Sequence, residues 1–552
     1  MTTTSTTSLF RPIIYTNVDA NNYTLYSQAM RCAGVALAAV FAVPVVARAT
    51  TTFQLIGLSE LQAVAPSING SGVHVAQVEA SDSSTTLNAF EPNPAALNTD
   101  SAFTFIDSSG NVSNTYNSAY ASGHAQTVAA LFYGGAGAGV APDVASVAVY
   151  AESYYFDTLY DDTAPINSSV GAAPAVVNQS FIYSGASAGT SAYLDQIWDN
   201  YAAQYNTLFV SAIGDGQTTA TTTPSYINPP ADMYNGLAVG AYTGSGGTPS
   251  TWVGPTWDGR SAPDLIAPGS ATSYTAPLVS GAAALLIQAG DENIGGAGTA
   301  AAATDIRTVK AVLLNSATKL PGWTNSYTVN SSTYTYLAAA AVTTTPLDPR
   351  YGAGMVNIYN AYENLAGGEH SYSAATSTPA GSAAITSPAV SFTGSKVTAL
   401  TGWNLASISA STSTNSVENY DFSLPGTSIN SWDLTATLTW NKNYNASGIN
   451  HLLLFLLNSS GQEVAASTSM VDNLQQINID SGLGLTALAP GQYDLAVEML
   501  GGSNMISTSD TYALAWNFLD PVSTPEPGAA VLLLAGSMLA LLRRKSRNYP
   551  TS

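Results

Sequence analysis

The chain has 552 residues and a mass of 56.7 kDa, enough for two or three domains with a sizeable core. Only 9% of its residues are charged and 46% are hydrophobic, a composition that excludes an intrinsically disordered chain. Between residues 50 and 542 there are 7 Lys and Arg against 34 Asp and Glu, a net charge of −27 (7 − 34). A body this acidic repels phosphate backbones, which excludes nucleic-acid binding as the main activity.

The N-terminal region has the pattern of a secretory signal. From Met30 the chain reads MRCAGVALAAVFAVPVVARA, an early arginine and an apolar run that ends in a small-x-small cleavage triplet. We predict that residues 1–49 form the signal region, cleaved after Ala49, with Met30 as an alternative start. A buried N-terminal helix is the other interpretation, but Pro44 would break it. Cys32, the only cysteine, lies inside this segment, so the mature chain would have no disulfide and no cysteine nucleophile.

Residues 50–368 alternate between strand-like and helix-like patterns. Runs such as HVAQV, VASVAVY, AVVNQSF and TLFVSAI are separated by helical segments that include SGHAQTVAALFY and TAPLVSGAAALLIQAG. Near-continuous apolar strands alternating with helices are typical of a mostly parallel sheet covered by helices on both faces. The predicted fold class of this domain is therefore α/β.

The remainder of the chain has a different composition. Residues 369–396 are rich in Ser, Thr, Ala and Pro without a helical period, which indicates a linker or a loosely packed edge. Residues 397–520 contain strand-length patterns such as SWDLTATLTW, HLLLFLLN and TYALAWNF, separated by turn sequences. They predict a C-terminal β-sandwich, which resembles the accessory domains of many secreted peptidases.

The last segment, residues 521–552, combines three features in a fixed order. TPEP at 524–527 precedes the apolar run 528–542, and three basic residues, 543–545, follow at once. This tail resembles the PEP-CTERM sorting signal of exported bacterial proteins, which a membrane-embedded exosortase recognises. The resemblance implies transient membrane insertion through 528–542 and an exosortase-type partner. It also implies export to the periplasm, the cell surface or the medium of a Gram-negative-type bacterium.

Three motifs in the α/β region supply the residue types of a nucleophilic triad. Glu79 ends the apolar strand VAQVE, His124 opens the helix GHAQTVA, and Ser273 opens the Ala-rich helix in ATSYTAPLVSG. A serine hydroxyl becomes a good nucleophile only when an imidazole takes its proton, and a carboxylate orients that imidazole. A serine that opens a helix can also direct its backbone N–H at a developing oxyanion. Each residue alone has a more ordinary explanation, an N-cap serine, a structural histidine or a strand-end charge.

The sequences around these residues resemble those of subtilisin-like serine peptidases (subtilases). TSYTAPLVSGAAALL resembles the subtilase serine signature and implies Ser273 as nucleophile. HAQTVAALF resembles the histidine block, with His124 as base, and VAQVEAS resembles the aspartate block, with Glu79 in the acid position. GVAPDVASVAVY, NGLAVGAYTG and APDLIAPG resemble further core segments in the family's order.

The same resemblance implies two substrate-binding segments. VVNQSF resembles the strand that pairs with an extended peptide substrate, which places Gln179, Ser180 and Phe181 along the cleft. FVSAIGDGQ resembles the segment that carries the oxyanion-hole asparagine, so Gly214 would contact substrate and Asp215 would take the oxyanion position. Strand addition provides main-chain hydrogen bonds to almost any sequence, which suits a broad-specificity endopeptidase.

The sequence departs from the subtilase pattern at three places. Glu79 replaces the usual Asp, with Asp82 as a weaker alternative acid. Asp215 replaces Asn, and an ionised carboxylate repels an oxyanion, so activity is favoured in acid, where Asp215 is protonated, or requires a donor such as Gln217. The partly similar sedolisins, which share the fold, carry an Asp at this position and work in acid. The loop before Ser273 is also short and has Ala where the signature has Gly.

We predict a secreted serine endopeptidase that cleaves polypeptides through an acyl-enzyme, with Glu79, His124 and Ser273 as its triad. Two alternatives remain open from the sequence: a catalytically weak subtilase fold that binds peptides or serves surface display, and an extracellular matrix protein whose β-sandwich carries the function. The four histidines lack metal-ligand spacing, so no metal or cofactor is expected. Structural Ca²⁺ remains a candidate because subtilases often bind it.

Overall fold

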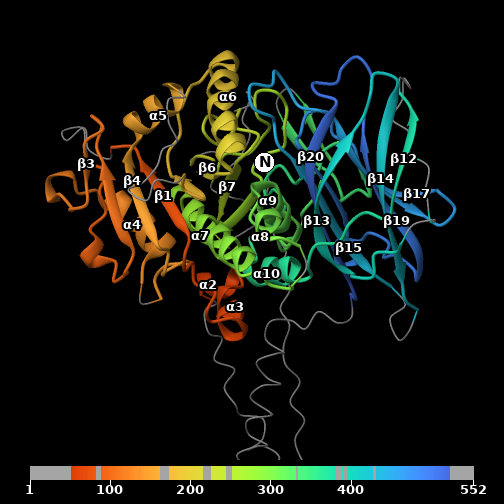
Figure 1. The fold of residues 1–552 in the computed structure, drawn as a ribbon, viewed down its shortest axis with the longest axis horizontal. Coiled ribbons are helices and arrows are strands. Elements are labelled where there is room, and N and C mark those ends of the chain that lie inside the picture. The colour runs from red at the N-terminus through yellow and green to blue at the C-terminus, as the bar shows by residue number, and fades with distance from the viewer. Residues whose placement is uncertain are drawn as a thin grey trace, which may run out of the picture. The chain divides into compact units, whose positions relative to one another are not determined.

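The computed structural model describes residues 51–81, 89–135, 137–161, 173–215, 226–243, 251–296, 298–330, 333–380, 388, 392, 395–426 and 431–521 (Figure 1). The predicted signal region and the sorting tail with its apolar run 528–542 lie outside these residues, as do Asp82 and Gln217. None of the helices in the described ranges has the length and apolar character needed to cross a bilayer. The described residues, from Thr51 to Pro521, belong to one compact unit.

Eight strands of the α/β region form one sheet in the order β3-β2-β4-β1-β5-β6-β7-β8. Neighbouring strands are parallel except for β2 and β3, which are antiparallel. The predicted α/β class with a mostly parallel sheet is therefore confirmed. The strands are β1 (His74–Glu79), β2 (Ala102–Ile106), β3 (Val112–Ser113), β4 (Ser146–Ala151), β5 (Val176–Gln179), β6 (Leu208–Ala212), β7 (Leu237–Tyr242) and β8 (Leu265–Pro268).

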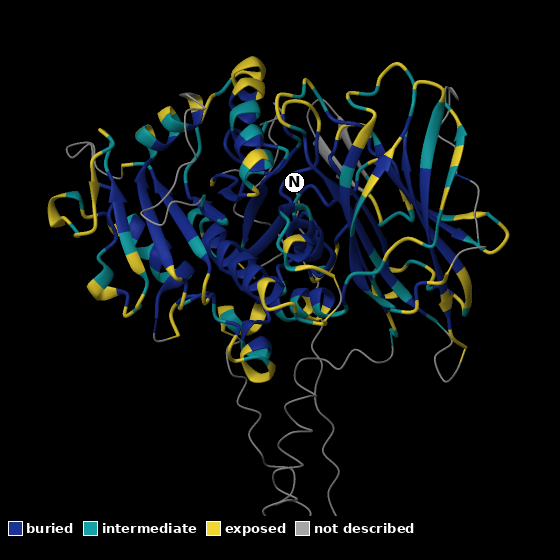
Figure 2. Cartoon of the chain, in the orientation of Figure 1, coloured by how far each residue is buried: buried dark blue, intermediate teal, exposed yellow. Residues whose placement is uncertain are grey.

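Helix α7 (Thr272–Asp291) is the central helix of this region and is buried along almost its whole length (Figure 2). Its small side chains let it pack closely against α4 (Gly123–Tyr133) and strands β5 to β8. Gly281 shows how close this packing is, because a Cβ there would lie 2.5 Å from Val140 Cβ. The other helices are α2 (Thr52–Leu55), α3 (Leu58–Val64), α5 (Glu152–Asp161), α6 (Ala188–Tyr205), α8 (Ala300–Ala303), α9 (Ile306–Asn315) and α10 (Ile358–Ala366).

The C-terminal region contains two sheets built mainly from antiparallel pairs. Their orders are β11-β17-β16-β19-β14-β12 and β13-β20-β15-β18, and a cluster of alternating apolar side chains fills the core of this region. The strands are β11 (Val342–Thr343), β12 (Ala374–Pro379), β13 (Thr401–Ser409), β14 (Thr414–Leu424), β15 (Asp433–Trp440), β16 (Leu452–Asn458), β17 (Glu463–Ser467), β18 (Leu474–Ile479), β19 (Gly491–Met499) and β20 (Ser509–Leu519). A separate hairpin joins β9 (Tyr327–Asn330) to β10 (Thr333–Tyr336).

The α/β region and the C-terminal region share strands and part of one hydrophobic core. β11 lies in the predicted catalytic domain yet pairs with β17, and β12 lies in the predicted linker yet pairs with β14. Helix α9 packs against β15 and β20, and Leu474, Ala513 and Ala515 belong to the same buried cluster as the α/β core. The C-terminal sheets therefore complete the hydrophobic core of the α/β region.

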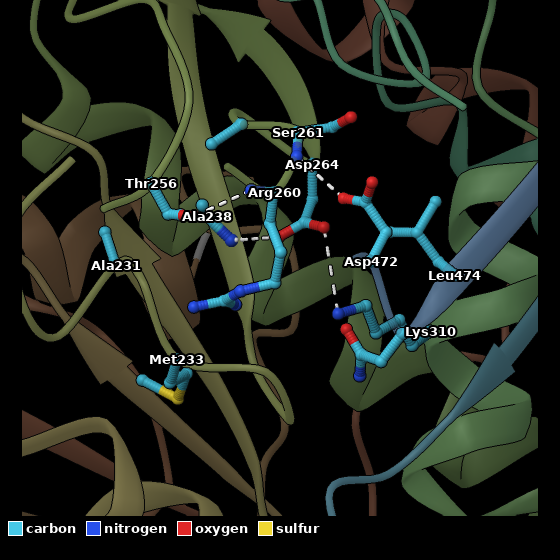
Figure 3. A pocket seen from close by; sticks show the side chains of 12 residues that line it. Ala231, Met233, Ala238, Thr256, Arg260, Ser261, Asp264, Lys310, Asp472 and Leu474 are labelled. Atoms are coloured by element: carbon cyan, nitrogen blue, oxygen red, sulfur yellow. Dashed lines mark hydrogen bonds and ion pairs between the residues drawn. The ribbon is translucent and has the colours of Figure 1, made fainter. Parts of the chain in front are cut away.

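A buried group of charged side chains crosses the contact between the two regions. Figure 3 shows part of it, where Lys310 faces Asp264 and the backbone N–H of Ser261 donates to Asp472. Arg260 lies over the Tyr234 ring at 3.6 Å from its centroid. The group contains five buried aspartates and three buried cations: Asp195, Asp199, Asp232, Asp264, Asp472, Arg260, Lys310 and Lys442. The carboxylates outnumber the cations, so this seam holds protons in the folded state.

The pKa values of these carboxyl groups follow from their burial. Loss of solvation raises the pKa of Asp199 and that of Asp472 to about 6, although nearby cations and hydrogen bonds oppose the shift. Burial and the neighbouring Asp232 also raise the pKa of Asp195. Burial raises the pKa of Asp232 as well, against the opposing effects of hydrogen bonds and of Arg260.

We expect the free energy of unfolding to fall as the pH rises from 4 to 6. In this window the unfolded chain has released protons that Asp199 and Asp472 still hold in the folded protein, so folding becomes less favourable as the pH rises. Each such group changes the free energy by at most about 1.4 kcal/mol per pH unit. Urea unfolding at pH 4, 5 and 6 measures this slope, and Asp472→Asn should make it shallower. Equal or rising stability across this range would contradict the assignment of protons to the seam.

Candidate active site

Glu79 and His124 meet at the carboxyl end of β1. Glu79 is the last residue of the strand, its side chain is 1% exposed, and its Oε2 lies 2.7 Å from His124 Nδ1. His124 lies in the first turn of α4, where the Ser122 side chain caps the helix by accepting from the Ala125 N–H. A carboxylate on Nδ1 fixes the tautomer with the proton on that nitrogen, which leaves Nε2 able to accept a proton.

A second layer of buried side chains holds Glu79 in place. Gln77 Nε2 donates to Glu79 Oε1 at 2.7 Å and to the Ala125 carbonyl oxygen at 3.0 Å. The Tyr133 hydroxyl donates to Gln77 Oε1. Burial and the Glu79 charge raise the pKa of Tyr133 well above its ordinary value, so the phenol remains a donor. The longer side chain of Glu is thus anchored from β1 and α4 together.

Ser273 lies in the first turn of α7, and the neighbouring sequence fixes its backbone. Pro277 has no N–H, so the Ser273 carbonyl, four residues earlier, lacks its helical donor. The Ser180 hydroxyl, just after β5, donates to that carbonyl at 2.9 Å. Asn178 Nδ2 in turn donates to Ser180 Oγ, and Ser280 Oγ donates to Asn178 Oδ1. The end of β5 is therefore tied to the start of α7 next to the candidate nucleophile.

The Ser273 hydroxyl donates to the Ser180 carbonyl oxygen at 3.2 Å. The start of α4 is close by, because the ring centroids of His124 and Tyr274 are 6.0 Å apart. Proton transfer to His124 requires Ser273 Oγ to turn from the Ser180 carbonyl toward the imidazole. Hydrogen bonds of catalytic groups commonly tighten only when substrate is bound, so this arrangement is compatible with a triad.

Asp215 binds the N-terminus of the serine helix. Its Oδ1 accepts from the Thr272 N–H at 2.7 Å and from the Thr272 hydroxyl at 3.0 Å. Ala271, the N-cap residue of α7, offers no side-chain acceptor, so Asp215 supplies the cap from another part of the chain. This role explains why a carboxylate is accommodated one residue from Ser273.

The other predicted substrate-binding residues differ in which of their atoms could reach a peptide. The Gln179 side chain is fully buried and accepts from Ser211 Oγ at 3.0 Å, so only its backbone could meet a peptide. Phe181 is half-buried against the Tyr183 ring. Gly214 has φ +108° and lies beside Trp252, and a Cβ there would be 3.2 Å from Ile182 Cδ1. The positive φ is the main reason why glycine is favoured at this turn.

Sequence reasoning did not select the residues that support these groups. Gln77, Asn178 and Thr272 each hold a candidate site residue or its backbone in place. A signal was present, because Gln77 and Asn178 interrupt otherwise apolar strands, and a polar side chain buried in a strand needs a nearby partner. Within the described ranges, no group of three or more His, Cys, Asp or Glu side chains has an arrangement suited to a metal ion.

Comparison with family models identifies the family of this chain. The model of the subtilase family (Peptidase_S8) matches residues 13–354, more than half of the chain. The chain belongs to the subtilase family. This membership supports a serine-type peptidase that acts on polypeptides. No curated protein matches the chain.

Three solved structures are similar to this subtilase at low identity. The self-cleaved protease domain of PatA is 20% identical with a TM-score of 0.34, covering 54% of this chain and 99% of that domain. Tripeptidyl peptidase 2 is 14% identical with a TM-score of 0.31, covering 74% of this chain and 41% of that one. A lanthipeptide protease is 17% identical with a TM-score of 0.35, covering 57% of this chain and 95% of that protease.

We expect Asp215→Ala to destabilise the protein by about 0.5–1 kcal/mol, because it removes the acceptor that caps α7. Asp215→Asn is the matched variant, since its amide oxygen can still accept from the Thr272 N–H, and its stability should stay closer to that of the wild type. Urea unfolding of the three proteins at one pH measures the difference. Equal stability of the Ala and Asn variants would show that the cap contributes nothing.

Proposed function

We propose that the protein is an exported serine endopeptidase that hydrolyses peptide bonds through an acyl-enzyme intermediate. The observation that carries the proposal is the 2.7 Å contact between the buried Glu79 and His124, on a helix that starts beside the one bearing Ser273. Membership of the subtilase family supports the same chemistry. Export and sorting by an exosortase-type enzyme rest on the sequence of the two ends.

In this proposal His124 Nε2 takes the proton of Ser273 Oγ as that oxygen attacks the substrate carbonyl. Glu79 stabilises the resulting imidazolium through Nδ1, and the imidazolium then gives its proton to the leaving amine. Water attacks the acyl-enzyme in the second half of the reaction, with His124 again acting as base. The peptide would lie along Ser180 and Phe181 as an added strand, so that backbone hydrogen bonds position it.

The oxyanion would form near the N-terminus of α7, where backbone N–H groups and the helix dipole favour negative charge. Asp215 lies at the same place. Its Oδ1 accepts two hydrogen bonds from Thr272, which hold the carboxylate at this helix end. In its ionised form, Asp215 would repel the oxyanion.

We expect a fluorophosphonate probe to label the wild-type protein at Ser273 and Ser273→Ala to abolish both labelling and peptide hydrolysis. The expected loss of kcat/KM is on the order of 10⁴-fold or more, because no other group can form the acyl-enzyme. Ser270→Ala, which removes a serine from the same loop, is the matched control and should retain labelling. Probe fluorescence in gels at pH 4 to 8 gives the measurement. Absence of labelling in folded wild-type protein at every pH would contradict a peptidase.

We expect Asp215→Asn to raise kcat/KM at pH 7 by on the order of 10²-fold, because an amide donates to the oxyanion where a carboxylate repels it. Cleavage of a fluorogenic peptide by both proteins at pH 7 measures this ratio. Lower activity of Asp215→Asn than of the wild type at pH 7 would show that Asp215 is not at the oxyanion position.

A further inference from the structure

The outer face of the six-stranded C-terminal sheet carries an unusual pair of carboxylates. Alternate residues of β14, β16 and β19 point away from the core of the C-terminal region, and on this face Val417, Phe455 and Ala496 form part of a small apolar cluster. Asp421 on β14 and Asp494 on β19 lie on the same face, directly opposite each other in the antiparallel register. Directly opposed residues have Cβ atoms about 4.5–5.5 Å apart, so the two side chains are neighbours.

Both carboxylates are buried and unbonded. Asp421 and Asp494 are each 0% exposed, and none of their four carboxylate oxygens has a hydrogen-bond partner. Buried carboxylates are ordinarily paired, hydrogen-bonded or bound to a metal ion, because an isolated buried charge is very unfavourable. Two facing carboxylates with all oxygens unbonded therefore need a proton or a bound cation to neutralise them.

Asn419 adds a third unbonded oxygen on the same face. It lies two residues before Asp421 on β14 and is also 0% exposed. Its Nδ2 is directed at β12, toward the Ala374 carbonyl oxygen at 3.4 Å and Thr376 Oγ1 at 3.3 Å. The opposite end of the amide, Oδ1, has no partner. Asn419 is paired with Ala496 in the register, so it is a diagonal neighbour of Asp494 on this face.

Most cationic side chains of the described residues have partners at other sites. Of the seven Lys and Arg between residues 50 and 542, six make ion pairs or hydrogen bonds at other sites: Arg260, Arg307, Lys310, Lys319, Arg350 and Lys442. The seventh, Lys396, is exposed and close enough to Asp421 to lower the pKa of that carboxyl group, against the larger effect of burial. Within the described ranges, its ammonium forms no ion pair shorter than 4.0 Å.

We propose that Asp421, Asp494 and Asn419 Oδ1 bind a divalent cation of the Ca²⁺ class on the outer face of this sheet. The donor set contains only oxygen, two carboxylates and one amide, which is the chemistry that Ca²⁺ prefers. Its flexible coordination can be completed by water, whereas Mg²⁺ requires near-ideal octahedral geometry. With two carboxylates, the site belongs to the weak class of extracellular calcium modules, with a dissociation constant on the order of 10⁻⁴ to 10⁻³ M. The bound ion would link strand β14 to strand β19.

The test compares thermal unfolding of the full chain in 10 mM Ca²⁺ and in EGTA at pH 8. Binding with a dissociation constant of about 1 mM shifts the folding equilibrium about tenfold at this concentration, so Ca²⁺ should raise Tm. Asp421→Asn/Asp494→Asn should remove that rise. In EGTA this double variant should also be more stable than the wild type, because it no longer buries two facing carboxylates.

Asp100→Asn/Glu363→Gln is the matched control, because it removes two exposed carboxylates at a distance from this sheet, and it should keep the wild-type response to Ca²⁺. Isothermal titration should find one binding event fewer in the Asp421/Asp494 variant than in the control. An equal Ca²⁺ response of both double variants would place calcium elsewhere and overturn the proposal. No response of the wild type to Ca²⁺ would overturn it as well.

Discussion

The start of helix α7 is the point on which the rest of the candidate site depends. Pro277 leaves the Ser273 carbonyl without its helical donor, and Ser180 supplies one from the end of β5. The Thr272 N–H lacks an acceptor from its own N-cap residue, and Asp215 supplies one from the segment after β6. Two unsatisfied helix-end groups thus recruit the residues that follow two adjacent strands. The serine is held where those strands end, and the parallel sheet brings β1, with Glu79, to the same edge.

The motif residues could be predicted from the sequence because their local patterns are strong. Strand VAQVE, helix GHAQTVA and helix TSYTAPLVSG form at the expected places, and the structure brings Glu79 and His124 into contact. The supporting contacts could not be predicted, because they join residues far apart in the chain. The capping of Thr272 by Asp215 spans 57 positions, and no local pattern indicates which helix end a carboxylate will reach. Sequence comparison alone suggested an impaired oxyanion donor at Asp215, whereas the structure gives the same carboxylate a capping role.

The strand within residues 369–396 could not be predicted from the sequence for a related reason. β12 is a Ser, Thr and Ala-rich edge strand without the apolar alternation that identifies a strand in sequence, and tertiary pairing with β14 overrides its weak local preference. β11, only two residues long, is likewise defined by its partner β17. Both strands tie the segment after the α/β core into the C-terminal sheet. The shared core around α9 then makes the two regions interdependent in folding.

The scarcity of cations connects the charged seam, the Asp421–Asp494 pair and the candidate active site. With seven Lys and Arg against 34 Asp and Glu between residues 50 and 542, most carboxylates cannot have a cationic partner. On the surface, water solvates the excess charge. In the seam between the two regions protons do so below about pH 6, because burial raises the pKa of Asp199 and Asp472 to about 6. At the Asp421–Asp494 pair, a proton or a divalent ion must neutralise the excess negative charge. At the candidate active site the N-terminus of α7 takes the place of a cation, because Asp215 Oδ1 accepts from the Thr272 N–H and the helix dipole favours its negative charge.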